Sequence, residues 1–212
     1  MYYASTKRTI DIIGSIISLI LFFPLLLITA FLIKMTSPGP VFADIPNRVG
    51  KGGKLFRIYK FRSMIMNAHK LMKKDPEFKD LYEEYKRSSY KLYKDPRVTK
   101  VGKIIRKYSI DEMPQFINVL RGEMSIVGPR AYYPDELDDQ QKKYPHTKAL
   151  VKEVLEVRPG ITGYWQVTGR SEVNFDKRIE MDAYYARKRS IWLDVLIIIK
   201  TPWAMISGKG AF

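Results

Sequence analysis

A charge-free apolar run near the N-terminus, from Ile12 to Ile33, constrains this chain more than any other feature. Its 22 residues have the length expected of a membrane-inserted helix. The run is too long for a cleavable signal peptide, and no small-x-small cleavage site follows it. A buried helix of a soluble protein is the alternative. We therefore expect a membrane-inserted segment at the start of the chain.

Pro24 lies near the middle of this run. An interior proline removes one helical hydrogen bond at a cost of ~3 kcal/mol, and it disfavours helical geometry at the preceding residue, Phe23. Each half of about 11 residues would be ~16 Å long, about half of a ~30 Å hydrocarbon core. Basic residues prefer the cytoplasmic side, and here they flank both ends, which favours a re-entrant helix–break–helix over a straight or kinked span. These residues are Lys7 and Arg8 before the run, and Lys34, Arg48, Lys51 and Lys54 after it.

The chain is strongly basic, with a net charge of +15 and a pI near 9.8. Nucleic acid, anionic lipid or phosphorylated small molecules could each explain this charge. The basic residues are mixed with acidic ones, as between Lys70 and Lys86, a pattern typical of a solvated helix surface. Together with the apolar run, the charge favours the cytoplasmic face of a membrane over nucleic acid. The chain has no Cys and only His69 and His146, which argues against disulfides and a His-built zinc site.

The remaining sequence is long enough for one domain with its own core. Short strands are expected at Val41–Ile45 and Leu55–Met64, joined through the glycines of Gly50–Gly53. The apolar segment Trp192–Ile206 is too short and too interrupted to span a membrane, so it is either an interfacial helix or a core helix. The pattern predicts an α+β fold that is mainly α, with further helices over Asn67–Tyr93, Arg97–Tyr108, Ile110–Leu120 and Glu172–Arg189.

The adjacent carboxylates Asp111 and Glu112 are the first candidate for chemistry. With Ser109 they fit a capping box, in which Ser and Glu side chains bond the free N–H groups of a helix start without any catalysis. A second hypothesis uses the same helix start. The positive end of the helix would favour ionised Asp111, a usable nucleophile toward phosphorus. Glu112 would then hold Mg²⁺, which binds one or two carboxylates plus substrate phosphates.

Two glycine-punctuated motifs that carry arginine follow the carboxylate pair. The first runs from Gly122 to Arg130, and the second from Val157 to Gly163, with Gln166 and Gly169–Arg170 after it. Glycine lets the backbone approach a ligand closely, and arginine matches two phosphate oxygens at once. Each motif alone is compatible with ordinary turns. Together in one small basic chain they indicate a polyanionic ligand.

The ordered set of these motifs resembles the monotopic phosphoglycosyl transferases, bacterial enzymes that transfer a sugar phosphate to a polyprenyl phosphate. The resemblance covers nearly the whole chain. The matching segments are Lys7–Asp11, Tyr59–Met64, Asp95–Thr99, Ser109–Arg130, Arg158–Gly163, Gln166–Arg170, Glu180–Tyr185 and the closing Gly208–Phe212.

The resemblance implies a membrane-inserted re-entrant helix over residues 1–36 and a catalytic domain over residues 37–212. That domain would lie on the cytoplasmic face of the bacterial inner membrane, with a small β-hairpin and C-terminal interfacial helices. Asp111 would attack a UDP-sugar, releasing UMP and holding the phosphosugar until undecaprenyl phosphate accepts it. Glu112 would bind Mg²⁺. The product would begin exopolysaccharide, capsule, O-antigen or glycoprotein glycan synthesis. Membrane lipid is an expected partner and nucleic acid is not; a homodimer stays open.

The family's other site positions carry over residue by residue. Phe23 and Pro24 would form the membrane break. Phosphate binding is implied for Lys60, Arg62, Arg106, Arg130, Arg158 and Arg170, and other active-site positions are Pro129, Gln166 and Asp182.

Two residues depart from the family pattern: Phe23 replaces a frequent Ser before the proline, and Ala131 replaces a Pro after Arg130. The long segment Asn67–Lys94 resembles the hexose-transferring branch, which favours a galactose or glucose donor over an N-acetylated amino sugar. A non-catalytic basic protein of the membrane surface is the alternative from a different class.

Overall fold

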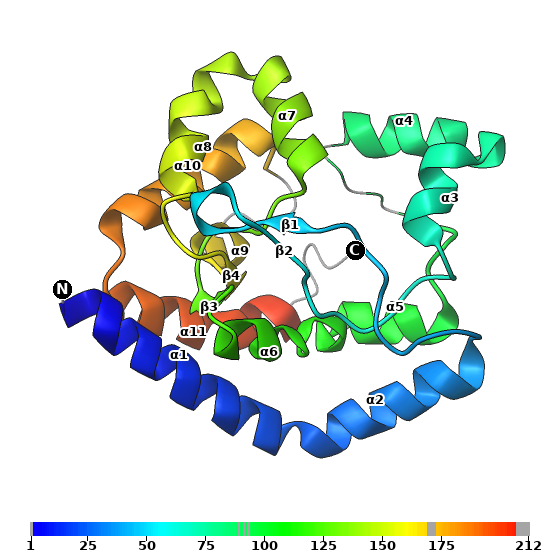
Figure 1. Cartoon of the computed structure of the whole chain (residues 1–212), viewed down its shortest axis with the longest axis horizontal. Helices are drawn as coiled ribbons and strands as arrows, with labels where there is room; N and C mark the ends of the chain where they lie inside the picture. The colour runs from blue at the N-terminus through cyan, green and yellow to red at the C-terminus, as the bar shows by residue number, and fades with distance from the viewer. Residues whose placement is uncertain (1, 89, 91, 93, 169–172, 207–212) are drawn as a thin grey trace.

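The computed structural model describes residues 2–88, 90, 92, 94–168 and 173–206, and it is mainly helical with two small sheets in this part of the chain (Figure 1). This confirms the predicted mainly α class. The α-helices are α1 (Tyr2–Leu21), α2 (Phe23–Thr36), α3 (Ala68–Lys74), α4 (Lys79–Arg87), α5 (Lys100–Lys107), α6 (Gln115–Leu120), α7 (Pro134–Lys143), α8 (Lys148–Val154), α9 (Tyr164–Thr168), α10 (Phe175–Lys188) and α11 (Ile191–Ile206). Short 3₁₀ turns are η1 (Lys51–Gly53), η2 (Pro76–Phe78), η3 (Ile110–Glu112) and η4 (Pro145–Thr147), and the strands are β1 (Arg48–Val49), β2 (Leu55–Phe56), β3 (Ser125–Val127) and β4 (Gly160–Thr162).

The apolar N-terminal run forms two helices that meet at a 62° bend. Phe22 separates α1 from α2, and Pro24 falls in the first turn of α2, where a missing N–H costs little because the first N–H groups of a helix have no internal partner. No single described helix is long and apolar enough to cross a membrane. Taken together, α1 and α2 have the length and composition of a broken span or a re-entrant loop.

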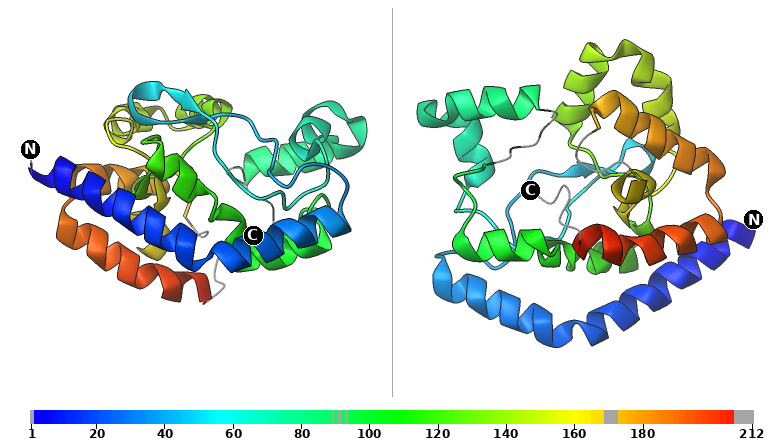
Figure 2. Two further views of the ribbon diagram at one scale, coloured as in Figure 1. Left: turned by 60° about the horizontal axis from the view of Figure 1, so that its bottom comes forward. Right: turned by 180° about the vertical axis from the view of Figure 1, so that it is seen from behind.

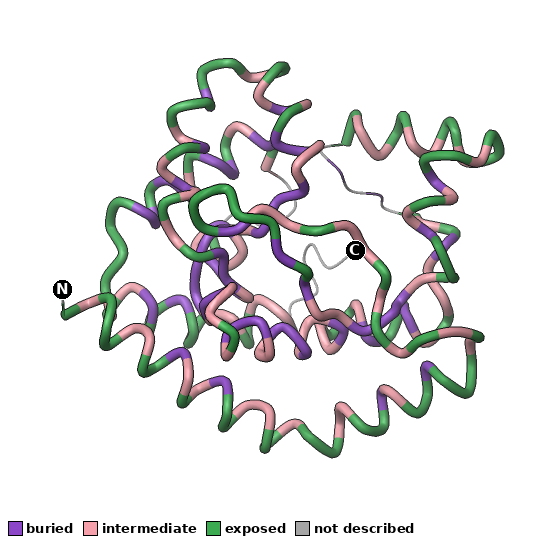
Figure 3. Tube along the Cα trace, viewed as in Figure 1, coloured by how far each residue is buried: buried purple, intermediate pink, exposed green. Residues whose placement is uncertain are grey.

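The bent helix pair packs along one edge of the molecule (Figures 1 and 2). α1 contacts α6, β3 and α11, whereas α2 lies against α5. Ile33 of α2 is buried with Phe61 and Ile105, which ties α2 to the segment before α5. Many outward residues of α1 and α2 are exposed, as Figure 3 shows along this edge. The pair therefore offers one face to the protein and an apolar face to its surroundings.

The predicted β-hairpin exists, but its strands are much shorter than expected. β1 and β2 pair antiparallel around the glycine turn, with Arg48 opposite Phe56. Val41–Ile45 is not a strand of this hairpin. That segment makes only an isolated bridge between Phe42 and Phe61. Pairing does not extend beyond this bridge: the Phe61 N–H donates to the Asp111 carbonyl, and the Ile65 N–H donates to the Arg97 carbonyl.

The two glycine–arginine motifs, interpreted above as turns, contain strands that pair with each other. β3 and β4 run parallel, with Ser125 opposite Gly160. A Cβ added at Gly160 would collide with the backbone of Gly128. The two segments of the chain approach this closely only because both residues lack a side chain. The tertiary contact thus joins motifs that are 35 positions apart (Ser125 to Gly160).

Two helix predictions need smaller corrections. Ile110–Leu120 is not one helix, because Pro114 separates η3 from α6. The helical region predicted over Asn67–Tyr93 is broken into α3, η2 and α4, and α4 ends at Arg87. α11 packs Ile197 into the core, as the core-helix alternative expects, whereas Trp192 and Trp203 are exposed and their interfacial role stays a prediction. The prediction of α10 is confirmed over Phe175–Lys188.

Candidate active site

Asp111 and Glu112 lie in the short turn η3 between α5 and α6. Ser109 precedes this turn in the left-handed conformation, with φ of 54°, and its side chain makes no capping hydrogen bond. The capping-box hypothesis is therefore wrong. The argument from a helix dipole also loses force, because three residues of 3₁₀ turn are too short to build one. The charges around the pair must instead come from other segments.

Lys60 supplies the nearest positive charge. The Phe61 N–H donates to the Asp111 carbonyl at 2.9 Å, which places the neighbouring Lys60 beside the pair. Lys60 Nζ lies 3.0 Å from Asp111 Oδ2 and 3.1 Å from Glu112 Oε1. The Asp111 side chain is 2% exposed and that of Glu112 is 35% exposed. One ammonium thus bridges a buried carboxylate and an accessible one.

The pKa values of the two carboxylates are shifted in opposite directions. Burial raises the pKa of Asp111 above its ordinary value, although Lys60 opposes this effect. Burial by itself would also raise the pKa of Glu112, but Lys60, Arg130 and Arg48 outweigh it and hold that pKa below its ordinary value. Groups whose environments drive their pKa values apart are typical of catalytic pairs. The arrangement suits a division of roles between Asp111 and Glu112.

Arg130 follows β3 in a turn whose backbone is hydrogen-bonded to the side chain of Asp182. The Arg130 N–H donates to Asp182 Oδ2 at 3.2 Å, and the Tyr132 hydroxyl donates to the same oxygen at 2.9 Å. Asp182 and Arg178 are fully buried. The guanidinium groups of Arg178 and Arg130 lie 5.0 and 6.0 Å from the ring of Trp165. The turn is therefore fixed through its backbone, and the guanidinium of Arg130 interacts electrostatically with Glu136 and, more weakly, with Glu112.

Burial raises the pKa of Asp182 from its ordinary 3.8 to about 7. An acid whose pKa is higher in the folded state makes folding less favourable as pH rises from about 4 to 7. Asp182→Asn keeps an acceptor for both donors but removes the charge. We expect this variant to gain up to about 4 kcal/mol in unfolding free energy at pH 8, from a pKa difference of about three at about 1.4 kcal/mol each. The gain should shrink at pH 5, as measured by thermal unfolding at both pH values. An equal gain at both would contradict the pKa.

The other predicted cations have different partners in the structure. Arg106, at the end of α5, acts electrostatically on both Asp111 and Lys60. The buried Arg62 instead donates to the carbonyls of Pro38 and Ser37 at 2.5 and 2.8 Å, so its guanidinium secures the end of α2 rather than facing the pair. The exposed Arg158 donates to the Gly122 carbonyl at 2.8 Å.

The remaining predicted residues support the β3–β4 junction. The Pro129 carbonyl accepts from the Gly160 N–H at 2.8 Å, and Gln166 Nε2 donates to the Ile161 carbonyl at 3.2 Å. Arg170 lies outside the described residues. For all of these positions, a part in substrate binding stays a prediction.

Sequence reasoning missed three residues that shape the site. The buried Asn118 accepts from the Tyr59 N–H at 2.8 Å and donates to the Arg57 carbonyl at 2.7 Å, which fixes the segment that carries Lys60. Arg48 stacks on the Tyr133 ring at 3.3 Å and lowers the pKa of Glu112. The third is Arg178, which is fully buried with its guanidinium 5.0 Å from the ring of Trp165. A polar residue inside an apolar helix was the available signal for Asn118; Arg48 and Arg178 had none beyond their charge.

The oxygen donors present fit Mg²⁺ better than a metal that needs a protein cage. Among the described residues, no group of three or more His, Asp and Glu side chains is placed to hold a metal ion. Mg²⁺ needs only one or two carboxylates and takes its other ligands from water and substrate phosphates. The carboxylate of Glu112, which is 35% exposed, would be one such oxygen ligand beside the nucleophile candidate.

Comparison with known proteins identifies the family of the chain. A family model described as bacterial sugar transferase matches residues 2–208. The chain belongs to the bacterial sugar transferase family. The resemblance inferred from its motifs is therefore confirmed.

Several relatives of this chain are named for their activities. A protein of Aeromonas hydrophila named UDP-N-acetylgalactosamine-undecaprenyl-phosphate N-acetylgalactosaminephosphotransferase is 43% identical, with 99% of this chain and 45% of that protein covered. The undecaprenyl-phosphate galactose phosphotransferase of Salmonella typhimurium is 41% identical, with 97% and 41% covered. The exopolysaccharide production protein ExoY of Rhizobium meliloti is 38% identical, with 97% and 88% covered. This chain thus spans less than half of the first two relatives.

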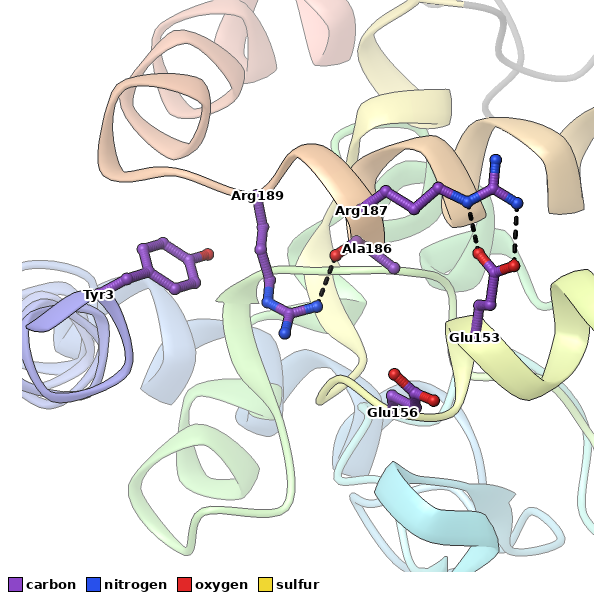
Figure 4. Close-up of a pocket in the computed structure, with 6 residues that line it drawn as sticks. All are labelled: Tyr3, Glu153, Glu156, Ala186, Arg187 and Arg189. Carbon is purple, nitrogen blue, oxygen red and sulfur yellow. Dashed lines mark hydrogen bonds and ion pairs between the residues drawn. The ribbon is translucent and has the colours of Figure 1, made fainter. Parts of the chain in front are cut away.

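A cavity of about 580 Å³ lies away from the carboxylate pair, between the start of α1 and the ends of α8 and α10 (Figure 4). Arg187 pairs with Glu153 through two contacts of 2.5 and 3.0 Å, and Arg189 donates to the Ala186 carbonyl at 2.5 Å. None of the predicted site residues that the structure describes lines this cavity.

Proposed function

We propose that the chain transfers a sugar 1-phosphate from a UDP-sugar to undecaprenyl phosphate, forming undecaprenyl diphosphate sugar and UMP. The observation that carries the proposal is the cluster of Asp111, Glu112 and Lys60, in a chain that belongs to the bacterial sugar transferase family. Relatives named for undecaprenyl-phosphate sugar phosphotransfer support the substrate classes. The reaction would begin the synthesis of a surface polysaccharide.

The proposed reaction has two displacements at one phosphorus atom. An Asp111 carboxylate oxygen attacks the phosphorus bonded to the sugar, the bond to the UMP oxygen breaks, and UMP leaves with its electron pair. A phosphate oxygen of undecaprenyl phosphate then attacks the same phosphorus and displaces Asp111. The ammonium of Lys60 supports this role because it favours ionised Asp111 despite burial. Arg130 and Arg106 would offset the charge of the donor phosphates.

Mg²⁺ held by Glu112 would neutralise charge on the transferring phosphates. We expect EDTA to abolish turnover and added Mg²⁺ to restore it, because chelation would remove the divalent cation that offsets the charge of the donor phosphates. UMP release measured before and after chelation checks this. Full activity in EDTA would refute the metal's role without touching the covalent step.

The edge formed by α1, α2, α5 and α11 supports a position at the inner membrane, and the basic residues that flank the apolar run favour the cytoplasmic face for the site. Large apolar side chains are exposed on each of these helices, and contiguous exposed apolar surface marks a membrane or partner contact. The bent α1–α2 pair would enter and leave on one side as a re-entrant hairpin. Examples on α1, α2, α5 and α11 are Ile20, Phe31, Ile104 and Trp203, respectively.

The donor sugar is best decided by experiment, because named relatives act on different sugars, N-acetylgalactosamine and galactose among them. We favour a hexose donor because of the long Asn67–Lys94 segment, and an N-acetylated amino sugar is the alternative. The test is UMP release by the reconstituted full chain from UDP-galactose, UDP-glucose and UDP-N-acetylgalactosamine. Release from one of them together with a lipid-linked product supports the proposal, and no release from any UDP-sugar would overturn it.

A further inference from the structure

α1 is joined to the rest of the protein by polar contacts as well as apolar ones. Tyr3, Lys7 and Asp11 recur every four residues and so share one face of the helix. The Tyr3 hydroxyl and Lys7 Nζ donate to Asp194 Oδ2 of α11 at 3.1 and 2.8 Å. Arg8 donates to the carbonyls of Val119 and Leu120 at the end of α6, at 2.6 and 2.9 Å. These contacts set the position of α1 against the domain.

Asp11 differs from the other three because it binds a strand that leads into the active site. Its side chain is buried, with the residue 2% exposed. The Ser125 hydroxyl donates to both carboxylate oxygens at 2.9 and 2.8 Å, and the Ile126 N–H donates to Oδ1 at 3.0 Å. Both donors belong to β3. A buried carboxylate bound only by neutral donors among the described residues is costly, so a packing role alone would be met more cheaply by an apolar side chain.

A short segment, Gly128–Pro129, connects β3 to Arg130, and two backbone hydrogen bonds fix it. The Gly128 N–H donates to the Thr162 carbonyl at 2.9 Å, and the Pro129 carbonyl accepts from the Gly160 N–H at 2.8 Å. The Arg130 N–H is then held by Asp182. With its backbone bonded at successive residues, the segment has little freedom to absorb a displacement of β3. A shift at the Asp11 end would therefore move Arg130.

We propose that Asp11 is a positioning residue for Arg130, which makes the membrane-inserted helix a working part of the donor half-reaction. The inference rests on the proposed function. Asp11 touches neither substrate nor the carboxylate pair; it acts by fixing where β3 ends and hence where the Arg130 guanidinium lies relative to Glu112. A change in how α1 sits in the bilayer would be felt at the donor site by the same route.

The test is a double-mutant cycle on the full chain in phospholipid nanodiscs, with UMP release from the accepted UDP-sugar as readout. Asp11→Leu removes both acceptors, and we expect kcat/KM to fall by roughly 10- to 100-fold, the scale of a small misplacement of a binding group. In an Arg130→Gln background the same change should cost less than about twofold, because coupled residues are not additive. Asp11→Asn should keep most activity, since its amide can accept from Ile126 and donate to Ser125.

Thr9→Leu is the matched control, because Thr9 is exposed on the same helix, and it should leave UMP release unchanged. Equal losses from Asp11→Leu in both backgrounds, or wild-type activity of that variant, would overturn the inference. If Asp11→Leu does not fold, Ser125→Ala removes one donor and enters the same cycle with the same criteria. A wild-type chain that releases no UMP from any donor would instead refute the proposed function, and the inference would fall with it.

Discussion

Asp111→Asn is expected to abolish the retention of labelled phosphosugar on the protein when labelled UDP-sugar is supplied without lipid acceptor. The amide cannot act as an anionic nucleophile, so UMP release should fall by roughly 10³-fold or more, the scale seen when a catalytic nucleophile is removed. Asp111 is buried beside Lys60. Asn is close to isosteric with Asp, so it fills the same space and the fold should persist. Autoradiography of denatured protein together with UMP release measures both effects.

Asp44→Asn is the matched control, because Asp44 is exposed, and it should retain the label like the wild type. The mechanism would be wrong if neither wild type nor Asp111→Asn retains labelled phosphosugar while lipid-linked product still forms. Direct attack by the lipid phosphate on the donor would then be the simpler account.

Lys60→Met is expected to have the second-largest effect. Lys60 Nζ bridges Asp111 and Glu112, and its loss would leave a carboxylate that is 2% exposed without its nearest cation. Removing one partner of a buried ion pair costs about 3–5 kcal/mol when the other stays charged. Asp111 would avoid part of this cost by taking up a proton. We therefore expect a smaller loss of stability, of about 2 kcal/mol, and a fall in UMP release of roughly 100-fold or more, since a protonated acid is a poor nucleophile.

Lys60→Arg provides the matched comparison, because it keeps the charge and changes its shape. It should fold as well as the wild type and recover part of the activity, whereas the surface change Lys103→Met should have no effect. Activity of Lys60→Met within a few-fold of wild type, with unchanged thermal stability, would show that Lys60 does not control the state of Asp111.

Local pattern predicted the helical content well where a segment contains its own signals. Pro24 in an apolar run predicted a broken helix, and the break lies at Phe22, within two residues of it. The periodic segment over α10 was likewise confirmed. Pattern failed where partners come from elsewhere: β3 and β4 have three residues each, too few to be recognised, and each exists because the other lies beside it.

The candidate site shows the same division. Motif order picked out Asp111, Glu112, Lys60, Arg130 and Asp182, and the structure brings Lys60 against the pair and Asp182 behind Arg130. The same reasoning assigned Arg62 to phosphate; its guanidinium binds carbonyls at the end of α2, and a role in phosphate binding stays a prediction. A guanidinium suits a carbonyl as well as a phosphate, so residue type alone could not separate the two roles.

The sequence by itself determined that this chain has a broken apolar segment, a basic surface and a carboxylate pair followed by two glycine–arginine motifs. These properties are local, because they depend on neighbouring residues and on the few conformations that proline and glycine favour. Only the tertiary structure decided which cation opposes the protonation of Asp111 and what places Arg130. Lys60 lies 51 positions before Asp111 and Asp11 lies 114 positions before Ser125, and electrostatic and hydrogen-bonding partners at such separations are set by packing, since no local preference encodes them.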